Sequence, residues 1–395
     1  MGGVVPPNAL TPPPLHLRRR LAWLGLGVVT WLAFRILLAF PQMAEVLVGS
    51  GPLPILAMGL SRASSPVPIS LAELVVLAVV LRQITGAVGG IRQVRRGVDS
   101  WRRTLARGGL RLGQDLGVLV FLFYLLWGFQ YARPGLDQQL GLESQGRLSV
   151  EELEPLARSA VQAANRAYLE LHGVPDAGAP TPRVAIDSLL PALEEGWKTV
   201  QARFHLDPRL ARPHGSPKAW TANSVAKRTA TSGMYFPYTG EALVVADLPM
   251  VRLGMTLAHE MAHQRGVAVE GDANALGFLV ARNAPDPRVR YSAYVFLQGQ
   301  MISALASVCV PCALELLEER VPGIERDLAD LGDFWAASRG AVSRAAGRMN
   351  HAMLRSHGIT EGTASYGGSR WILAALALRD GPEILFGEEG EPAGR

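Results

Sequence analysis

The stretch TLAHEMAHQRG, residues 256–266, contains the pattern His-Glu-x-x-His and dominates this sequence. Residues four apart in a helix lie on one face, so His259 and His263 can direct two imidazoles towards one point. A tetrahedral Zn²⁺ site needs this arrangement of its first two protein ligands. Glu260 lies beside them, within reach of a water molecule at the metal. The stretch therefore predicts a helix with a zinc site, in which His259 and His263 are ligands and Glu260 is the general base.

The residues that follow offer a third metal ligand. Gly266 can end the first helix in a left-handed turn, and Glu270 and Asn274 would share one face of a second helix. We expect Glu270 to be the third ligand and Asn274 to hydrogen-bond a ligand imidazole. Asp272 is the alternative third ligand, whereas a histidine three residues after the glycine is excluded because Val269 stands there. The competing interpretation is a surface helix whose two histidines bind no metal.

The composition indicates membrane segments. Hydrophobic residues make up 49% of the 395 residues and charged residues only 18%, which is apolar for a soluble protein of this length. The length is sufficient for two domains. The two cysteines, Cys309 and Cys312, are too few for a disulfide framework. They would be either unreactive thiols or one local bridge in an oxidising compartment.

Three apolar segments predict three transmembrane helices, at about residues 21–40, 69–91 and 112–131. A helix of about twenty residues spans about 30 Å, the thickness of one hydrocarbon core. A cleaved signal peptide is the alternative for the first segment, but its length and the two segments that follow favour a retained helix. We therefore expect a disordered Pro-rich tail at 1–17 and a membrane domain at 18–133.

The charges between these segments predict their orientation. The loop after the second segment carries seven arginines, whereas the expected loop over residues 41–70 carries only Arg62. Because positively charged loops stay in the cytoplasm, we expect a bacterial inner-membrane protein with its N-terminus inside and the chain after about Ala132 in the periplasm. Nucleic-acid binding is the alternative role of the arginines, and their position between two apolar segments argues against it. The seven are Arg92, Arg95, Arg96, Arg102, Arg103, Arg107 and Arg111.

Residues 134–395 are expected to form one mostly helical domain with a small sheet. Ser149 is a candidate N-cap for a helix that runs to about His172. A further, charged helix is expected at about 321–346, and the acidic tail after Glu383 is expected to fray.

The segment 231–246, directly before the metal helix, is rich in aromatic and β-branched residues and predicts a strand or hairpin. Pro237 favours a sheet edge or a bulge. An edge strand beside a metal helix can accept a peptide as an added strand, and Tyr235 and Tyr238 would then line the substrate cleft. The alternative is an ordinary core hairpin.

Five short motifs carry a resemblance to a known family: GMYFPYTGEA at 233–242, HEMAHQRG at 259–266, EGDAN at 270–274, Tyr291-Ser292 and Ser365-Tyr366-Gly367. Together they resemble the bacterial domain of unknown function 3810 family, which looks like a membrane-anchored branch of the gluzincin metallopeptidases. The resemblance covers most of the chain, to about residue 380. It implies a zincin-like α+β fold, one zinc ion per chain and glutamate as the third ligand, but it implies no substrate.

We therefore expect a membrane-anchored zinc metallopeptidase that hydrolyses a peptide or protein substrate. Zinc lowers the pKa of bound water towards about 7 and polarises the scissile carbonyl, while Glu260 takes a proton and passes it to the leaving amine. Tyr366, Tyr235 and Tyr238 are candidates to stabilise the oxyanion. The alternative is a metal-containing membrane protein that binds peptides or senses the cell envelope without cleavage, and the complete His-Glu-x-x-His pattern argues against it.

Overall fold

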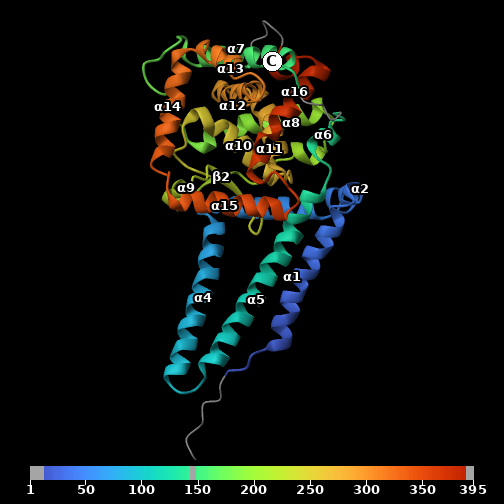
Figure 1. Ribbon diagram of the computed structural model, residues 1–395, viewed down its shortest axis with the longest axis vertical. Coiled ribbons are helices and arrows are strands. Elements are labelled where there is room, and N and C mark those ends of the chain that lie inside the picture. Colours follow the sequence, from blue (N-terminus) through green and yellow to red (C-terminus); the bar gives the residue numbers. More distant parts are fainter. Residues whose placement is uncertain (1–12, 143–147, 388–395) are drawn as a thin grey trace, which may run out of the picture.

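The computed structural model describes residues 13–142 and 148–387, and most of the expected N-terminal tail lies outside these ranges. It has two parts, three long helices and a helical domain above their upper ends (Figure 1). The long helices are α1 (Leu17–Leu37), α4 (Leu71–Arg95) and α5 (Trp101–Leu126). Each is long and apolar enough to cross a membrane.

Glycines allow α1 and α5 to pack closely. A Cβ atom added to Gly27 would lie 2.7 Å from the carbonyl oxygen of Gly117, so the two backbones are almost in contact there. Small residues at a helix crossing permit such an approach. Helix α4 is linked to α5 by an ion pair between Arg82 and Asp115, at 2.9 Å. The three helices therefore form one bundle.

The third long helix differs from the prediction at both ends. It begins at Trp101 rather than near residue 112, because the Ser100 hydroxyl caps it by accepting the Arg103 amide hydrogen. Arginine is compatible with helix, so four of the seven arginines lie on α5 and the loop spans only residues 96–100. After Leu126 the chain forms the short 3-10 helix η2 (Gly128–Ala132).

Residues 41–64 of the segment 41–70 are mostly helical, whereas a loop was expected over the whole segment, and residues 65–70 are not helical. The segment forms α2 (Pro41–Ala44), the π-helical turn η1 (Glu45–Gly49) and α3 (Leu53–Ser64), with a bend of 47° between the first two and the third. The loop was predicted from the prolines of this segment. That prediction was wrong because prolines lie in the first turn of α2 and of α3, where a missing N–H group costs nothing. These helices lie at the junction between the long helices and the domain.

The domain is built around three buried helices, α10 (Met250–Gln264), α11 (Glu270–Arg282) and α12 (Pro287–Ala306). The predicted capped helix is confirmed as α7 (Val150–His172), whose Ser149 and Glu152 form a capping box. The remaining helices surround this core. They are α6 (Leu136–Gln139), η3 (Ile186–Ser188), α8 (Leu190–Arg203), η4 (Pro208–Ala211), α9 (Asn223–Arg228), α13 (Val310–Glu318), α14 (Pro322–Ala336), α15 (Ala341–Ser356), η5 (Gly362–Gly368), α16 (Ser369–Asp380) and α17 (Glu383–Phe386).

One small sheet lies beside α10. Its strands β1 (Lys218–Ala219), β2 (Gly233–Phe236) and β3 (Glu241–Val244) have the order β1-β3-β2. Strands β2 and β3 are antiparallel, with Tyr235 opposite Ala242, and β1 is parallel to β3. The predicted hairpin is therefore confirmed, and β2 is an edge strand.

The C-terminal third differs from the prediction in one helix. The expected helix at 321–346 is broken into α14 and α15, because the chain turns at Gly340, which is extended and has low helix propensity. Helix α15 then crosses the lower face of the domain (Figure 1). Earlier in the chain, Cys309 and Cys312 form a disulfide at the start of α13.

Candidate metal centre

Close packing of α10 and α11 brings the predicted ligands together. A Cβ atom added to Gly277 of α11 would lie 3.1 Å from the backbone nitrogen of His259, so the glycine lets α11 approach the metal helix at its first histidine. Between the helices, Gly266 has the left-handed φ of 93°, as predicted for the turn. This turn returns the chain so that Glu270, the first residue of α11, faces both histidines.

Three side-chain atoms converge at the centre of this site. The Nε2 atoms of His259 and His263 are 3.0 Å apart, and Glu270 Oε2 lies 3.2 Å and 3.3 Å from them. A tetrahedral ion with bonds of about 2.0–2.1 Å places its ligand atoms about 3.3 Å apart. The triangle therefore has the dimensions of three corners of such a site, and His259, His263 and Glu270 could hold a metal ion.

Hydrogen bonding prepares His263 for a metal. Its Nδ1 lies 2.7 Å from the carbonyl oxygen of Val267, which can only accept a hydrogen bond. The proton of neutral His263 is therefore on Nδ1, and the lone pair of Nε2 points to the centre of the triangle. Within residues 13–142 and 148–387, the buried Glu270 Oε2 forms no hydrogen bond, which fits an atom that could bind a cation.

The charges of the site are strongly coupled. Burial opposes ionisation of both His263 and Glu270, yet each stabilises the charge of the other, so the pKa of His263 is raised to about 9 and that of Glu270 is lowered. Burial raises the pKa of Glu260 to about 8. A carboxyl group with a pKa near neutrality can both accept and release a proton, as a general base and acid must.

A cavity of about 280 Å³ opens beside Glu260 and His259. The edge strand β2 forms one wall, and it comes close because Gly233 has no side chain. A Cβ atom there would lie 2.5 Å from the Glu260 carboxylate. The cavity is lined by Ala230, Thr231, Ser232, Gly233, Arg252, Met255, Thr256, His259, Glu260, Asn274, Asn350 and Tyr366.

Tyr366 lies in this cavity, as the sequence analysis expected. Its ring stacks on that of His259 at 6.4 Å, and Asn350 Nδ2 donates to its hydroxyl at 3.3 Å. Burial and the charge of Glu270 raise the pKa of Tyr366, so its hydroxyl remains a neutral donor. In the described part of the chain Asn274 forms no hydrogen bond with an imidazole, which differs from the prediction. Its amide is turned to the backbone and donates to the carbonyl oxygen of Tyr366 at 3.0 Å.

Tyr235 and Tyr238 do not line the cavity, contrary to the prediction. Tyr235 is buried below the site, where its ring lies 4.9 Å from that of Trp127, which in turn contacts His263. The Tyr238 hydroxyl donates to the carbonyl oxygen of Leu119 on α5. Both tyrosines therefore connect the sheet to η2 and the long helices, because the turn after β2 meets the upper end of α5.

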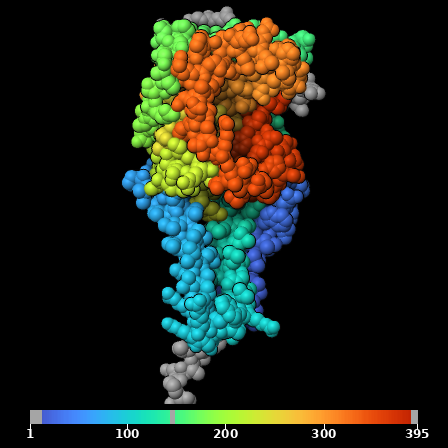
Figure 2. Space-filling view, turned by 60° about the vertical axis from the view of Figure 1, so that its left-hand side comes forward, coloured from blue at the N-terminus to red at the C-terminus, as the bar shows by residue number. Residues whose placement is uncertain are grey.

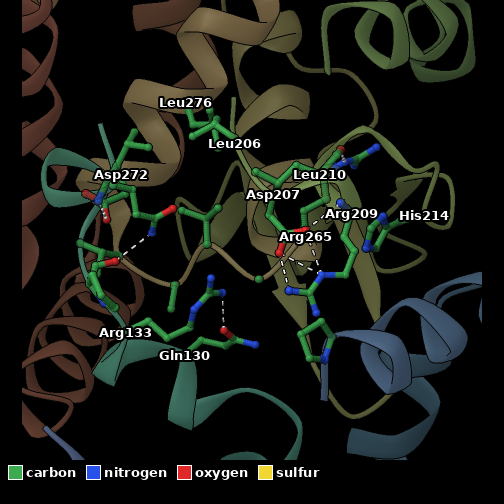
Figure 3. Close-up of a pocket in the computed structure, with 18 of the residues that line it drawn as sticks. Gln130, Arg133, Leu206, Asp207, Arg209, Leu210, His214, Arg265, Asp272 and Leu276 are labelled. Atoms are coloured by element: carbon green, nitrogen blue, oxygen red, sulfur yellow. Dashed lines mark hydrogen bonds and ion pairs between the residues drawn. The ribbon is translucent and has the colours of Figure 1, made fainter. Parts of the chain in front are cut away.

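Asp272, the alternative third ligand, faces away from the histidines. Its carboxylate accepts the Leu136 amide hydrogen at 2.9 Å, on the wall of a second pocket (Figure 3). Burial raises the pKa of Asp272 to about 7. Helical geometry explains why Glu270 faces the histidines and Asp272 does not, because residues two apart on α11 point to different sides.

The sequence analysis missed several residues of the site. Arg252 and Thr256 line the cavity on α10, and their spacing to Glu260 at i, i+4 and i+8 could have identified them. Asn350 comes from α15, far along the chain, and no local sequence pattern predicts its position in the cavity.

Comparison with known proteins gives one match. The model of the family described as "Protein of unknown function (DUF3810)" matches residues 51–370, which include every residue of the metal centre. No curated protein and no solved structure matches the chain. Since the matched region covers most of the sequence, this protein belongs to the DUF3810 family.

Proposed function

We propose that this protein is a membrane-anchored zinc metallopeptidase. The observation that carries the proposal is the triangle of His259, His263 and Glu270 with Glu260 at the adjoining cavity. Two imidazoles and one carboxylate are the protein ligands of a catalytic zinc site with an open position. When bound, zinc would supply a Lewis acid that polarises the scissile carbonyl.

Residues of the chain would bind the peptide, transfer the proton and stabilise the oxyanion during hydrolysis. The edge of β2 offers free backbone groups to an extended peptide, which would lie along the cavity wall. Glu260 takes a proton from the attacking water and passes it to the leaving amine. Tyr366, held by Asn350 and Asn274, donates its hydroxyl hydrogen to the oxyanion.

Membrane anchoring and orientation belong to the same proposal. The arginines of the α4–α5 turn and those that begin α1 lie at the end of the bundle remote from the domain. The positive-inside rule then favours a cytoplasmic location for that end and an extracytoplasmic location for the domain, in a bacterial inner membrane. The disulfide Cys309–Cys312 supports this orientation, because disulfides persist in oxidising compartments.

The test uses the full chain purified in detergent, by elemental analysis and by cleavage of a peptide library. We expect about one zinc per chain and metal-dependent cleavage. Glu260→Gln should keep the zinc and lower the cleavage rate by about 10²–10⁴-fold, because it removes the general base.

Two results would overturn the proposal. Full activity in Glu260→Gln would exclude the mechanism. Zinc without cleavage of any peptide would favour the alternative, a metal-containing protein that binds peptides or senses the envelope.

A further inference from the structure

Helix α15 presents an unpartnered apolar stripe. Val342, Met349 and Met353 are 56%, 74% and 40% exposed, and Ala345 and Ala352 are exposed between them. Their spacing of three and four residues places all five on one face of the helix. Exposed large apolar side chains in such a row indicate a contact surface.

The other faces of α15 are different. Leu354 is fully buried in a cluster with the upper ends of α1 and α5, and Asn350 on the same face reaches Tyr366 in the metal-site cavity. Arg344, Arg348 and Arg355 follow one edge of the apolar stripe, and the helix contains no acidic residue. An apolar stripe bordered by arginines is the pattern of a helix that lies on an anionic lipid surface.

The end of α15 is attached to the upper ends of the long helices. His357, the residue after α15, stacks on Tyr131 of η2 at 5.0 Å and contacts Phe34 of α1 and Phe123 of α5 at 5.8 and 5.1 Å. Gly358 lies against Leu38, just after α1. Helix α15 therefore lies at the level where the long helices end (Figure 1), and Figure 2 shows C-terminal segments above the blue and cyan helices.

A second group of helices exposes apolar side chains at the same level. Helices α2, η1 and α3 lie at this junction. Met43, Val46, Leu47 and Ile55 of these helices are 45%, 68%, 58% and 59% exposed. Apolar surface thus continues from the long helices onto the lower face of the domain.

We propose that α15 lies in the lipid–water interface, with its stripe against the acyl chains and its arginines at anionic headgroups. This inference rests on the proposed membrane anchoring, but not on catalysis. It commits to lipid because the helix that carries the stripe ends against the upper ends of the apolar bundle and because the stripe is bordered by positive charge. Since Asn350 lies on a neighbouring face of α15 and lines the metal-site cavity, a helix seated on the bilayer would form one wall of that cavity.

The test places a fluorescent probe at single positions of the full chain in nanodiscs. Because both native cysteines are in a disulfide, one introduced cysteine can be labelled with the polarity-sensitive dye NBD. The positions are Met349→Cys on α15, Leu81→Cys on the exposed side of α4 as the membrane control, and Leu314→Cys on α13 as the exposed control remote from the bundle. Quenching is measured with lipids that carry a doxyl group near the headgroup or deep in the acyl chain.

We expect the Met349 probe to be blue-shifted and quenched by the shallow doxyl lipid, and the Leu314 probe to be unaffected. Quenching at Leu81 without quenching at Met349 would overturn the inference and leave the anchoring intact. Absence of quenching at Leu81 would overturn the anchoring itself. A blue shift at Met349 without quenching would overturn the lipid proposal, because it would show that the stripe contacts protein, such as a second copy of this chain.

The arginines are tested in the same system. The triple variant R344Q/R348Q/R355Q should weaken quenching at Met349 in nanodiscs with phosphatidylglycerol but not in pure phosphatidylcholine. Equal quenching of the variant and its parent in both lipids would exclude the role of the arginines.

Discussion

Two polar clusters adjoin the turn between α10 and α11, and they differ in how their charged groups are paired. The pocket near Asp272 is lined by three arginines (Figure 3), and each of them forms an ion pair with a carboxylate. The pairs are Arg265 with Glu194, Arg133 with Glu45 and Arg209 with Asp207. In the metal centre, three buried atoms have no hydrogen-bond partner, namely His259 Nδ1, Glu260 Oε2 and Glu270 Oε2.

The contrast distinguishes a cluster of paired charges from a cluster that leaves polar atoms free for a ligand. A buried charge that is paired connects elements and leaves nothing for a ligand. A buried polar atom without a partner is costly, and it persists where a metal or substrate completes it. Within the described residues, these three unpartnered atoms belong to His259, Glu260 and Glu270, whereas no side chain that lines the second pocket has such an atom, so the contrast favours the first cluster as a ligand site.

The strongest test of this contrast neutralises, in two separate variants, each of the two acidic residues at the start of α11. Glu270→Gln should reduce zinc from about one per chain to nearly none, because a neutral amide is a poor zinc ligand. The matched variant Asp272→Asn should keep its zinc, since its side chain faces Leu136. Elemental analysis of both full chains measures this, and loss of zinc in Asp272→Asn alone would assign the third ligand to Asp272.

A smaller effect is expected at the tyrosines. Tyr366→Phe removes one oxyanion donor and should lower kcat by about 10²-fold, with zinc content unchanged. Tyr238→Phe removes a hydroxyl that donates to α5 and should leave kcat unchanged. Steady-state kinetics on a cleaved peptide compares them, and equal kcat values would remove Tyr366 from the mechanism.

The second cluster predicts a loss of stability without a loss of metal. Glu194→Ala leaves the guanidinium of Arg265, which is 0% exposed, without its carboxylate partner. Leaving a buried donor unsatisfied costs about 1–3 kcal/mol. The thermal unfolding midpoint of the detergent-solubilised chain should fall while zinc content stays the same. An unchanged midpoint would show that the pair does not stabilise the fold.

The smallest predicted effect concerns pH and the end of α15. Burial lowers the pKa of His357 below its usual value of about 6.5. As pH falls through about 6.5, the unfolded chain gains a proton there and the folded chain does not, so stability decreases. His357→Phe keeps an aromatic ring and should lose less stability between pH 7 and 5 in thermal unfolding. An identical pH dependence in the variant would exclude His357 as its source.

Periodic patterns in the sequence were sufficient to predict much of this molecule. The spacing of His259 and His263 predicted two converging imidazoles, because helix geometry alone places them on one face, and it left Glu270 as the favoured third side chain with Asp272 as the alternative. The cap at Ser149 located α7, and the long apolar runs located the three long helices. In each case the information is local, within a few turns of helix or one apolar run.

Other features depend on contacts between distant segments. Only the tertiary structure places Asn350 in the metal-site cavity, turns Tyr238 to α5 and buries Trp127 beneath His263. It also decided between Glu270 and Asp272 as the residue that faces the histidines, because that choice depends on the angle at which α11 meets α10. The sequence by itself determined which chemical groups are present and their local geometry. Packing decided which of these groups come together. Two elements approach closely where a glycine has no side chain, as Gly277 of α11 does against His259 and Gly233 of β2 does against Glu260.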